Sequence, residues 1–266
     1  MEEESRLERG YRKLKEVDGK AGEAVKESLS DISPDLVKYM IEYSFGDVYS
    51  REGLGLKSKE IAVVAALTAL GNARPQLKVH INGALNVGCS VNDIKEVIIQ
   101  MTAYSGFPTA INAMNALKEV LEERKSEGIE DYAGEECTNE VSPMERYQAG
   151  VRELSQLDKN QAKLLEDTYK DFSPALTKLI IQSYADIIGR NNLSKRYRQI
   201  ATIAALTALG NAEPQLRFHI NSGLNVGLTE EEIKEIMLLM TVYSGFPSAI
   251  SGMNVLKNIL RERVQI

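Results

Sequence analysis

The chain has 266 residues, with 32 basic and 38 acidic side chains and a formal net charge of −6. This length forms one large domain or two of ordinary size, and either can bury a core. The acidic balance argues against a nucleic-acid partner, because phosphate binding normally requires a basic stripe. No apolar run is long enough to span a membrane.

The N-terminus and the cysteines indicate the compartment. The segment Met1–Glu4 is acidic, whereas a secretory signal begins with basic and then apolar residues. The two cysteines, Cys89 and Cys137, are far apart and lie in unlike contexts, which argues against a disulfide framework. We therefore expect a cytoplasmic protein.

The sequence repeats internally. An offset of 139 residues aligns 61–124 with 200–263, and 40 of these 64 positions are identical. Nearer the N-terminus the offset becomes 140, so one residue was gained or lost between the two regions. The repeat predicts two domains of normal size, residues 1–125 and 146–266. The acidic segment 126–145 is predicted to be a solvated linker.

Each copy shows the signals of four successive helices. In the first copy, the Ala-rich segment Glu60–Leu70 is apolar nearly all round, which is typical of a buried central helix. A second helix is expected over Gln76–Val87, where Gly88 ends it. A third follows the capping sequence Ser90–Asp93, and a fourth is expected over Pro108–Lys125. No segment alternates strictly between apolar and polar residues, so the predicted fold class is all-α.

The only two histidines, His80 and His219, occupy the same position of the repeat. On a helical wheel, His80 falls at the edge of the apolar arc, beside Gln76. This predicts a mostly buried ring with one nitrogen tied to a polar neighbour and the other facing a crevice. A hydrogen-bonded core histidine would produce the same pattern, and the wheel alone leaves both interpretations open. Gln76 and its counterpart Gln215 are candidate substrate-binding residues.

Charged residues lie before and at the start of the central helix. Arg51 and Arg190 are equivalent and are candidates for binding a substrate carboxylate, although a surface ion pair is the simpler explanation. Glu60 opens the first central helix as a candidate proton-transfer residue, and an acid there also suits the helix dipole. Its counterpart Gln199 cannot act as a general base, which predicts two unequal sites.

The third helix of each copy carries further candidates. Glu96 and Glu235 lie on this helix, and Tyr104 and Tyr243 lie at its end. Each could reach a histidine-bearing helix as a catalytic or substrate-binding side chain. An exposed helix face or an aromatic plug would contain the same residue types.

Metal and thiol chemistry receive little support from motifs. The chain has no His-x-x-x-His or Cys-x-x-Cys sequence, and a carboxylate near either histidine would have to come from another helix. We therefore predict no metal site. Cys89 is replaced by Leu228 in the second copy and Cys137 lies in the linker, so neither is expected to be a catalytic nucleophile.

Together these motifs resemble the carboxymuconolactone decarboxylase family, which includes the alkylhydroperoxidase D (AhpD) type of peroxidase. The resemblance rests on a helix of the form LxxHxxxxLxxG, a capped acidic turn, and the sequence EVIIQMTAYSGFP. It covers about residues 33–124 and 173–263. The Arg51-x-Gly53-Leu54 segment also resembles the family, whereas the second copy has Asn192 in place of the glycine.

The resemblance implies two tandem AhpD-like helical domains and a reaction that needs no cofactor. In decarboxylase-like members, histidine acts with arginine and acidic side chains on a small lactone that bears carboxylates. Loss of carbon dioxide requires a cation for the retained carboxylate and a proton donor for the developing carbanion, and arginine and histidine suit these tasks.

Peroxidase-like members of the family carry a Cys-x-x-Cys just before the histidine. Here Ala73 and Gln76 occupy those positions, and Ala212 and Gln215 do so in the second copy. A thiol peroxidase without these thiols cannot reduce peroxide by that mechanism. Peroxidase activity is therefore the disfavoured alternative.

The leading hypothesis is a lyase that uses His80 and His219 as acid/base groups on a small carboxylated substrate. A helical scaffold that binds a small ligand without converting it is the alternative from a different class. Relatives with a single domain tend to form hexameric rings, so we expect three chains to form a closed ring of six domains. The central helices and the YSGFP corners are the expected contact surfaces.

Overall fold

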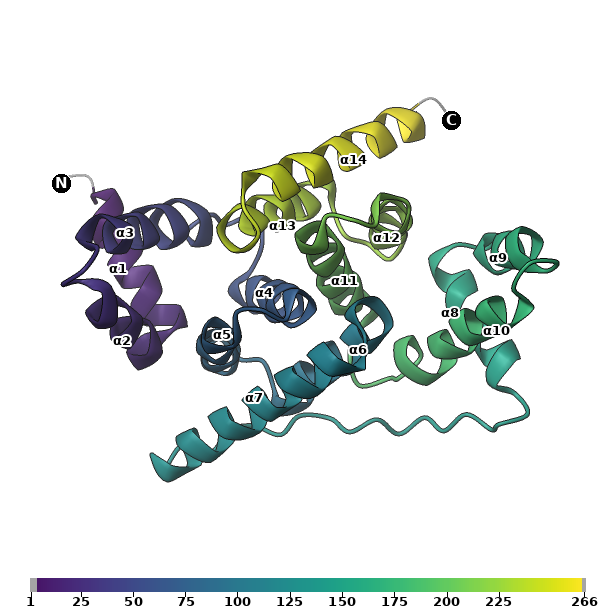
Figure 1. The fold of residues 1–266 in the computed structure, drawn as a ribbon, viewed down its shortest axis with the longest axis horizontal. Helices are drawn as coiled ribbons and strands as arrows, with labels where there is room; N and C mark the ends of the chain where they lie inside the picture. The colour runs from purple at the N-terminus through teal and green to yellow at the C-terminus, as the bar shows by residue number, and fades with distance from the viewer. Residues whose placement is uncertain (1–3, 265–266) are drawn as a thin grey trace.

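The computed structural model describes residues 4–264, and within this range the regular structure consists entirely of helices (Figure 1). The first half contains α1 (Arg6–Val17), α2 (Gly19–Leu29), α3 (Pro34–Tyr39), η1 (Met40–Tyr49), α4 (Leu56–Leu70), α5 (Arg74–Asn86), α6 (Val91–Ser105) and α7 (Phe107–Ser126). The second contains α8 (Arg146–Leu157), α9 (Gln161–Tyr169), α10 (Pro174–Ser183), η2 (Tyr184–Ile188), α11 (Lys195–Leu209), α12 (Glu213–Asn225), α13 (Glu230–Tyr243) and α14 (Phe246–Val264). The all-α prediction is confirmed. None of the helices described has both the length and the apolar character needed to cross a bilayer.

The four predicted helices of the first copy are α4 to α7. The central helix α4 begins at Leu56 rather than at Glu60, and Gly71 ends it in the left-handed conformation with φ of 67°. Ser90 and Asp93 form a reciprocal capping box at the start of α6. Thr229 caps α13 in the same way. These local signals are confirmed because each satisfies backbone groups that a helix end leaves unpaired.

A π-helix explains why the repeat offset changes. Ile41 and Ile181 are related by 140 residues, whereas Ser44 and Ser183 are related by 139, so the first copy holds one extra residue between them. That residue lies in η1, a ten-residue π-helix, whereas η2 in the second copy spans only five residues. A π-helix accommodates an inserted residue without breaking the surrounding helix.

The two halves are joined through their central helices. α4 and α11 pack against each other in the middle of the molecule (Figure 1), and the residues of both helices are buried along most of their length. α13 also contacts α4 and η1, while α6 contacts α11 and η2. The third helix of each half therefore packs within its own half and also contacts the central helix of the other half.

The connection between the halves, residues 127–145, contains no helix and lies along the first half before reaching α8 (Figure 1). The backbone N–H of Val91 donates to the carbonyl of Tyr132 at 3.0 Å, and that of Asn92 donates to Ala133 at 2.9 Å. The acidic connection is thus held at the N-terminus of α6, where unpaired N–H groups need acceptors.

Candidate active site

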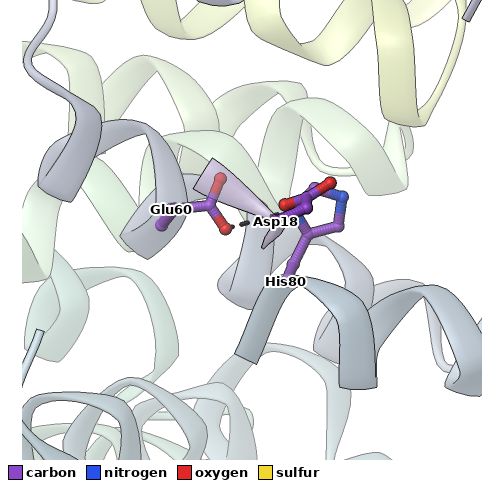
Figure 2. Close-up of side chains that lie close together, drawn as sticks. All are labelled: Asp18, Glu60 and His80. Atoms are coloured by element: carbon purple, nitrogen blue, oxygen red, sulfur yellow. Dashed lines mark hydrogen bonds and ion pairs between the residues drawn. The ribbon is translucent and has the colours of Figure 1, made fainter. Parts of the chain in front are cut away.

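His80 is tied to a glutamate of the central helix. It lies on the buried face of α5, and its Nδ1 is 3.1 Å from Oε2 of Glu60 on α4 (Figure 2). The Tyr49 hydroxyl donates to Oε1 of Glu60 at 2.7 Å, so both carboxylate oxygens are engaged. Tyr49 has already used its only proton, so the Tyr243 hydroxyl donates to Tyr49 at 2.8 Å. Within residues 4–264, Nε2 of His80 has no hydrogen-bond partner.

Asp18 is a third ionisable residue at this site, and sequence analysis missed it. It follows α1, is only 3% exposed, and places Oδ1 3.9 Å from Nδ1 of His80 (Figure 2). This oxygen is buried and finds no hydrogen-bond partner among residues 4–264. The available signal was the repeat, because Asp158 occupies the equivalent position at the offset of 140.

Gly83 makes room for the two carboxylates. A Cβ atom at this position would lie 2.9 Å from Oδ1 of Asp18 and 3.0 Å from Oε2 of Glu60. In the second copy, Ser222 occupies the equivalent position. The absence of a side chain at Gly83 therefore allows both acids to approach the histidine from one side.

The surroundings shift the pKa values of His80 and Asp18. Burial disfavours the imidazolium of His80, but Glu60 and Asp18 outweigh this effect and raise the pKa of His80 above its ordinary value. Burial raises the pKa of Asp18 to about 7, although the attraction of His80 opposes the shift. The site therefore favours a charged His80 beside Glu60, together with an aspartic acid that keeps its proton up to neutral pH.

A cavity of about 410 Å³ adjoins His80 and Asp18. Its walls are mainly apolar and include Leu36, Met40, Val79 and Val242. Tyr243 comes from the second half and meets the His80 ring edge to face, with the centroids 4.9 Å apart. Among the residues that line the cavity, His80 is the only one that can carry a positive charge.

His219 has the same position in the second half but different partners. Its Nδ1 is 2.9 Å from Oε1 of Gln199, and its Nε2 is 3.2 Å from the hydroxyl of Tyr104, which the first half supplies. Burial, with no carboxylate to oppose it, lowers the pKa of His219 to about 3. The cavity beside it is larger, about 680 Å³.

The structure separates the predicted site residues into two groups. Glu60 contacts His80, and Gln76, Gln215, Tyr104 and Tyr243 line the two cavities, with each tyrosine serving the histidine of the other half. The two predicted arginines and the two glutamates of the third helices instead form ion pairs between the halves, and they line neither cavity. Arg51 pairs with Glu235 at 2.7 Å, and Arg190 pairs with Glu96 at 2.8 Å.

Asp18, Glu60 and His80 are also the described residues that could hold a metal ion. Their potential ligand atoms all lie within 4.8 Å of one another, and all three side chains are buried. The predicted absence of a metal site rested on missing sequence motifs. Such motifs do not reveal ligands that come from separate helices.

The cysteines lie away from both histidines. Cys89 is buried, which raises the pKa of its thiol to about 12, and it lines neither histidine cavity. Cys137 lies in the connection between the halves. Ala73 and Gln76, which occupy the positions of the peroxidase cysteines in the resemblance, both line the cavity of the first half.

Comparison with known proteins identifies the family. The model of the carboxymuconolactone decarboxylase family matches residues 34–119 and 174–258. The 4-carboxymuconolactone decarboxylase of Acinetobacter baylyi is 30% identical over 124 residues, which cover 46% of this chain and 92% of that protein. Nitrosuccinic acid decarboxylase npaB of Metarhizium robertsii is 26% identical over 87 residues, covering 33% of this chain and 60% of that protein. An uncharacterized 15.0 kDa protein of Paracoccus denitrificans is 31% identical over 101 residues, covering 38% of this chain and 75% of its own length. The chain therefore belongs to the carboxymuconolactone decarboxylase family and contains two copies of its domain.

Proposed function

We propose that the protein is a decarboxylase that acts on a small carboxylated, lactone-like substrate in the cavity beside His80 and needs no cofactor. The observation that carries the proposal is the arrangement of His80. Glu60 holds its Nδ1, whereas its Nε2 lies beside an apolar cavity and has no hydrogen-bond partner among the residues that the structure describes. A histidine held in this way can deliver a proton from Nε2 to a bound molecule.

The proposed reaction uses this geometry as follows. The bond between the carboxylate carbon and the ring breaks, carbon dioxide leaves, and the electron pair moves into the conjugated lactone carbonyl. Nε2 of His80 then donates its proton to the resulting carbanion, and water restores that proton afterwards. Glu60 stabilises the imidazolium before transfer. The apolar walls limit water around the substrate carboxylate.

The positions of the arginines modify the expected substrate contacts. Arg51 is bound to Glu235 and does not line the cavity, so we propose that His80 itself provides the cation that the substrate meets. Asp18, which keeps its proton up to about neutral pH, can donate a hydrogen bond to a second carboxylate. Gln76 at the cavity wall supplies a further neutral contact.

The test uses 4-carboxymuconolactone and measures the release of carbon dioxide. We expect turnover by the wild-type protein, a loss of roughly 10²-fold or more in His80→Gln, and a much smaller loss in His219→Gln. No release by the wild-type protein would refute this substrate class. Mass spectrometry of a copurified small molecule, followed by incubation with the protein, tests the alternative of a binding scaffold, because a bound ligand that stays unchanged would support that alternative.

We also propose that three chains assemble into a ring of six domains. Large apolar side chains are exposed at equivalent positions in both halves: Leu36 and Leu176, Tyr39 and Leu179, Phe107 and Phe246, Ile111 and Ile250. A matched pair of apolar surfaces suits repeated contacts between copies of one chain. The central helices α4 and α11, which sequence analysis expected at chain contacts, pack against each other within the chain.

A further inference from the structure

The second half contains a cavity that the proposed reaction does not use. We infer that this cavity is a binding site for an uncharged aromatic or alicyclic molecule, which it holds without transferring a proton to it. The contrast with a catalytic first half rests on the proposed function, whereas the binding itself does not. Three differences between the copies support the inference.

The first difference is that both ring nitrogens of His219 are occupied by uncharged groups. Oε1 of Gln199 has no proton to donate, so Nδ1 of His219 must carry the proton of their 2.9 Å hydrogen bond. In the neutral ring Nε2 is then an acceptor, and the Tyr104 hydroxyl donates to it at 3.2 Å. His219 is therefore held in one tautomer, and neither nitrogen is free to exchange a proton with a bound molecule.

The second difference explains why Tyr104 takes this position. Its counterpart Tyr243 donates instead to Tyr49 in the first half, which leaves Nε2 of His80 without a partner within the described part of the chain. At the position equivalent to Tyr49, the second half has Ile188, which offers no acceptor. The hydroxyl of Tyr184, the counterpart of Phe45, donates to Tyr104 instead, and Tyr104 donates its own proton to Nε2 of His219 in a hydrogen bond. Ile188 contributes by offering Tyr104 no competing acceptor.

The third difference is the loss of charge around the histidine. Gln199 replaces Glu60, and Ser222 fills the space that Gly83 leaves open for two carboxylates. Asp158 does line the cavity, but it forms no ion pair with His219, and its Oδ1 accepts a hydrogen bond from the backbone of Asn160 at 2.8 Å. The side chains that hydrogen-bond to His219 are therefore uncharged.

The size and walls of this cavity set the class of ligand. Its volume of about 680 Å³ falls within the range of sites for small organic molecules. The walls include the apolar side chains of Leu164, Leu165, Ile180, Ile188 and Phe218. Charged side chains also border this cavity. Arg217 is paired with Glu262, and the positive charge of Arg263 is balanced by the negative charge of Asp158. An uncharged, ring-sized molecule matches these surroundings best.

A fluorescence titration with the uncharged probe N-phenyl-1-naphthylamine tests the binding site. Gln215→Trp would fill this cavity, and Gln76→Trp is the matched control, because both glutamines are exposed, line their cavities and occupy equivalent positions. We expect Gln215→Trp to weaken binding by at least tenfold or to remove one bound probe per chain, and Gln76→Trp to retain that site. Unchanged affinity and stoichiometry in Gln215→Trp would overturn the inference.

Nitrogen NMR of the histidine rings tests, independently of any activity, whether His219 stays in the neutral tautomer with its proton on Nδ1. We expect His219 to remain neutral, with the proton on Nδ1, from pH 8 to pH 5. A titration of His219 near pH 6.5 would overturn this part of the inference. In the double variant Ile188→Tyr/Gln199→Glu, which introduces the first-half residues, we expect His219 to take up a proton within this range. Failure to do so in a folded variant would reject the role given to these two positions.

The two proposals can fail independently. If the protein releases no carbon dioxide from the lactone but the probe binds as expected, the proposed function fails and the binding site stands. If the protein converts the lactone through His80 but Gln215→Trp binds the probe as the wild type does, the proposed function stands and the binding site fails.

Discussion

Replacing Glu60 by Gln gives the first half the residue that the second half carries naturally at Gln199. The substitution keeps the size of the side chain and an acceptor for Nδ1 of His80, but it removes the negative charge 3.1 Å away. We expect the pKa of His80 to fall below its ordinary value, because burial then acts against a weaker opposing attraction. The proton donor of the proposed reaction would be lost at neutral pH.

The second half shows how large this effect should be. Burial without a carboxylate partner lowers the pKa of His219 to about 3, which corresponds to about 5 kcal/mol against protonation at about 1.4 kcal/mol per pKa unit. Two unit charges 3.1 Å apart attract by about 5 kcal/mol at an effective dielectric constant of about 20. Glu60 alone thus offsets a burial cost of this size. Asp18 remains in the variant but, at 3.9 Å and without a hydrogen bond, compensates only in part.

The assay measures protonation and turnover together. The chain has only two histidines, so NMR shows two sets of ring signals, and His219→Gln assigns them. In Glu60→Gln we expect His80 to become neutral near pH 7 and kcat on the lactone to fall roughly 10²- to 10⁴-fold. The reverse substitution Gln199→Glu is the control, and it should raise the pKa of His219. If His80 titrated as in the wild type and kcat changed less than about threefold, the electrostatic explanation would be refuted.

Further predictions concern packing, thiols, acid stability and assembly. Gly83→Ser should lower the free energy of unfolding by about 1 to 3 kcal/mol in urea titrations, because its Cβ would crowd two carboxylate oxygens; stability equal to that of the wild type would contradict this packing. Replacing both Cys89 and Cys137 by serine should leave turnover unchanged, and a large loss of peroxide consumption in that variant would revive the peroxidase alternative. As the pH falls below about 6.5, His219 becomes protonated in the unfolded chain, whereas in the folded chain it stays neutral until about pH 3. The free energy of unfolding of the wild type should therefore fall relative to that of His219→Gln, by up to about 1.4 kcal/mol per pH unit. Parallel pH profiles of the two proteins would argue against a buried neutral ring. Light scattering should give a mass near three times 29.5 kDa, whereas a stable particle of one chain at micromolar concentration would exclude the trimer.

Local sequence determined the helices and the duplication. The apolar, Ala-rich pattern placed the central helix, and glycine and capping residues placed the helix ends, because each of these signals acts within one or two turns of chain. The wheel also placed His80 at the edge of a buried face, where the structure finds it 6% exposed. The change from Glu60 to Gln199 was sufficient to predict unequal sites, since an amide cannot carry the charge of a carboxylate.

The tertiary structure decided which side chains meet. Asp18 reaches His80 from the turn between α1 and α2 and depends on the missing side chain of Gly83, and no local pattern records such a contact. Arg51 meets Glu235 rather than the cavity beside His80, because the third helix of each half also contacts the other half. The same contact between halves brings Tyr104 to His219, where Ile188 offers that tyrosine no acceptor and the tyrosine donates to the histidine. Helical periodicity reports which face of a helix is buried. The partner that covers that face is chosen by packing between segments far apart in the chain.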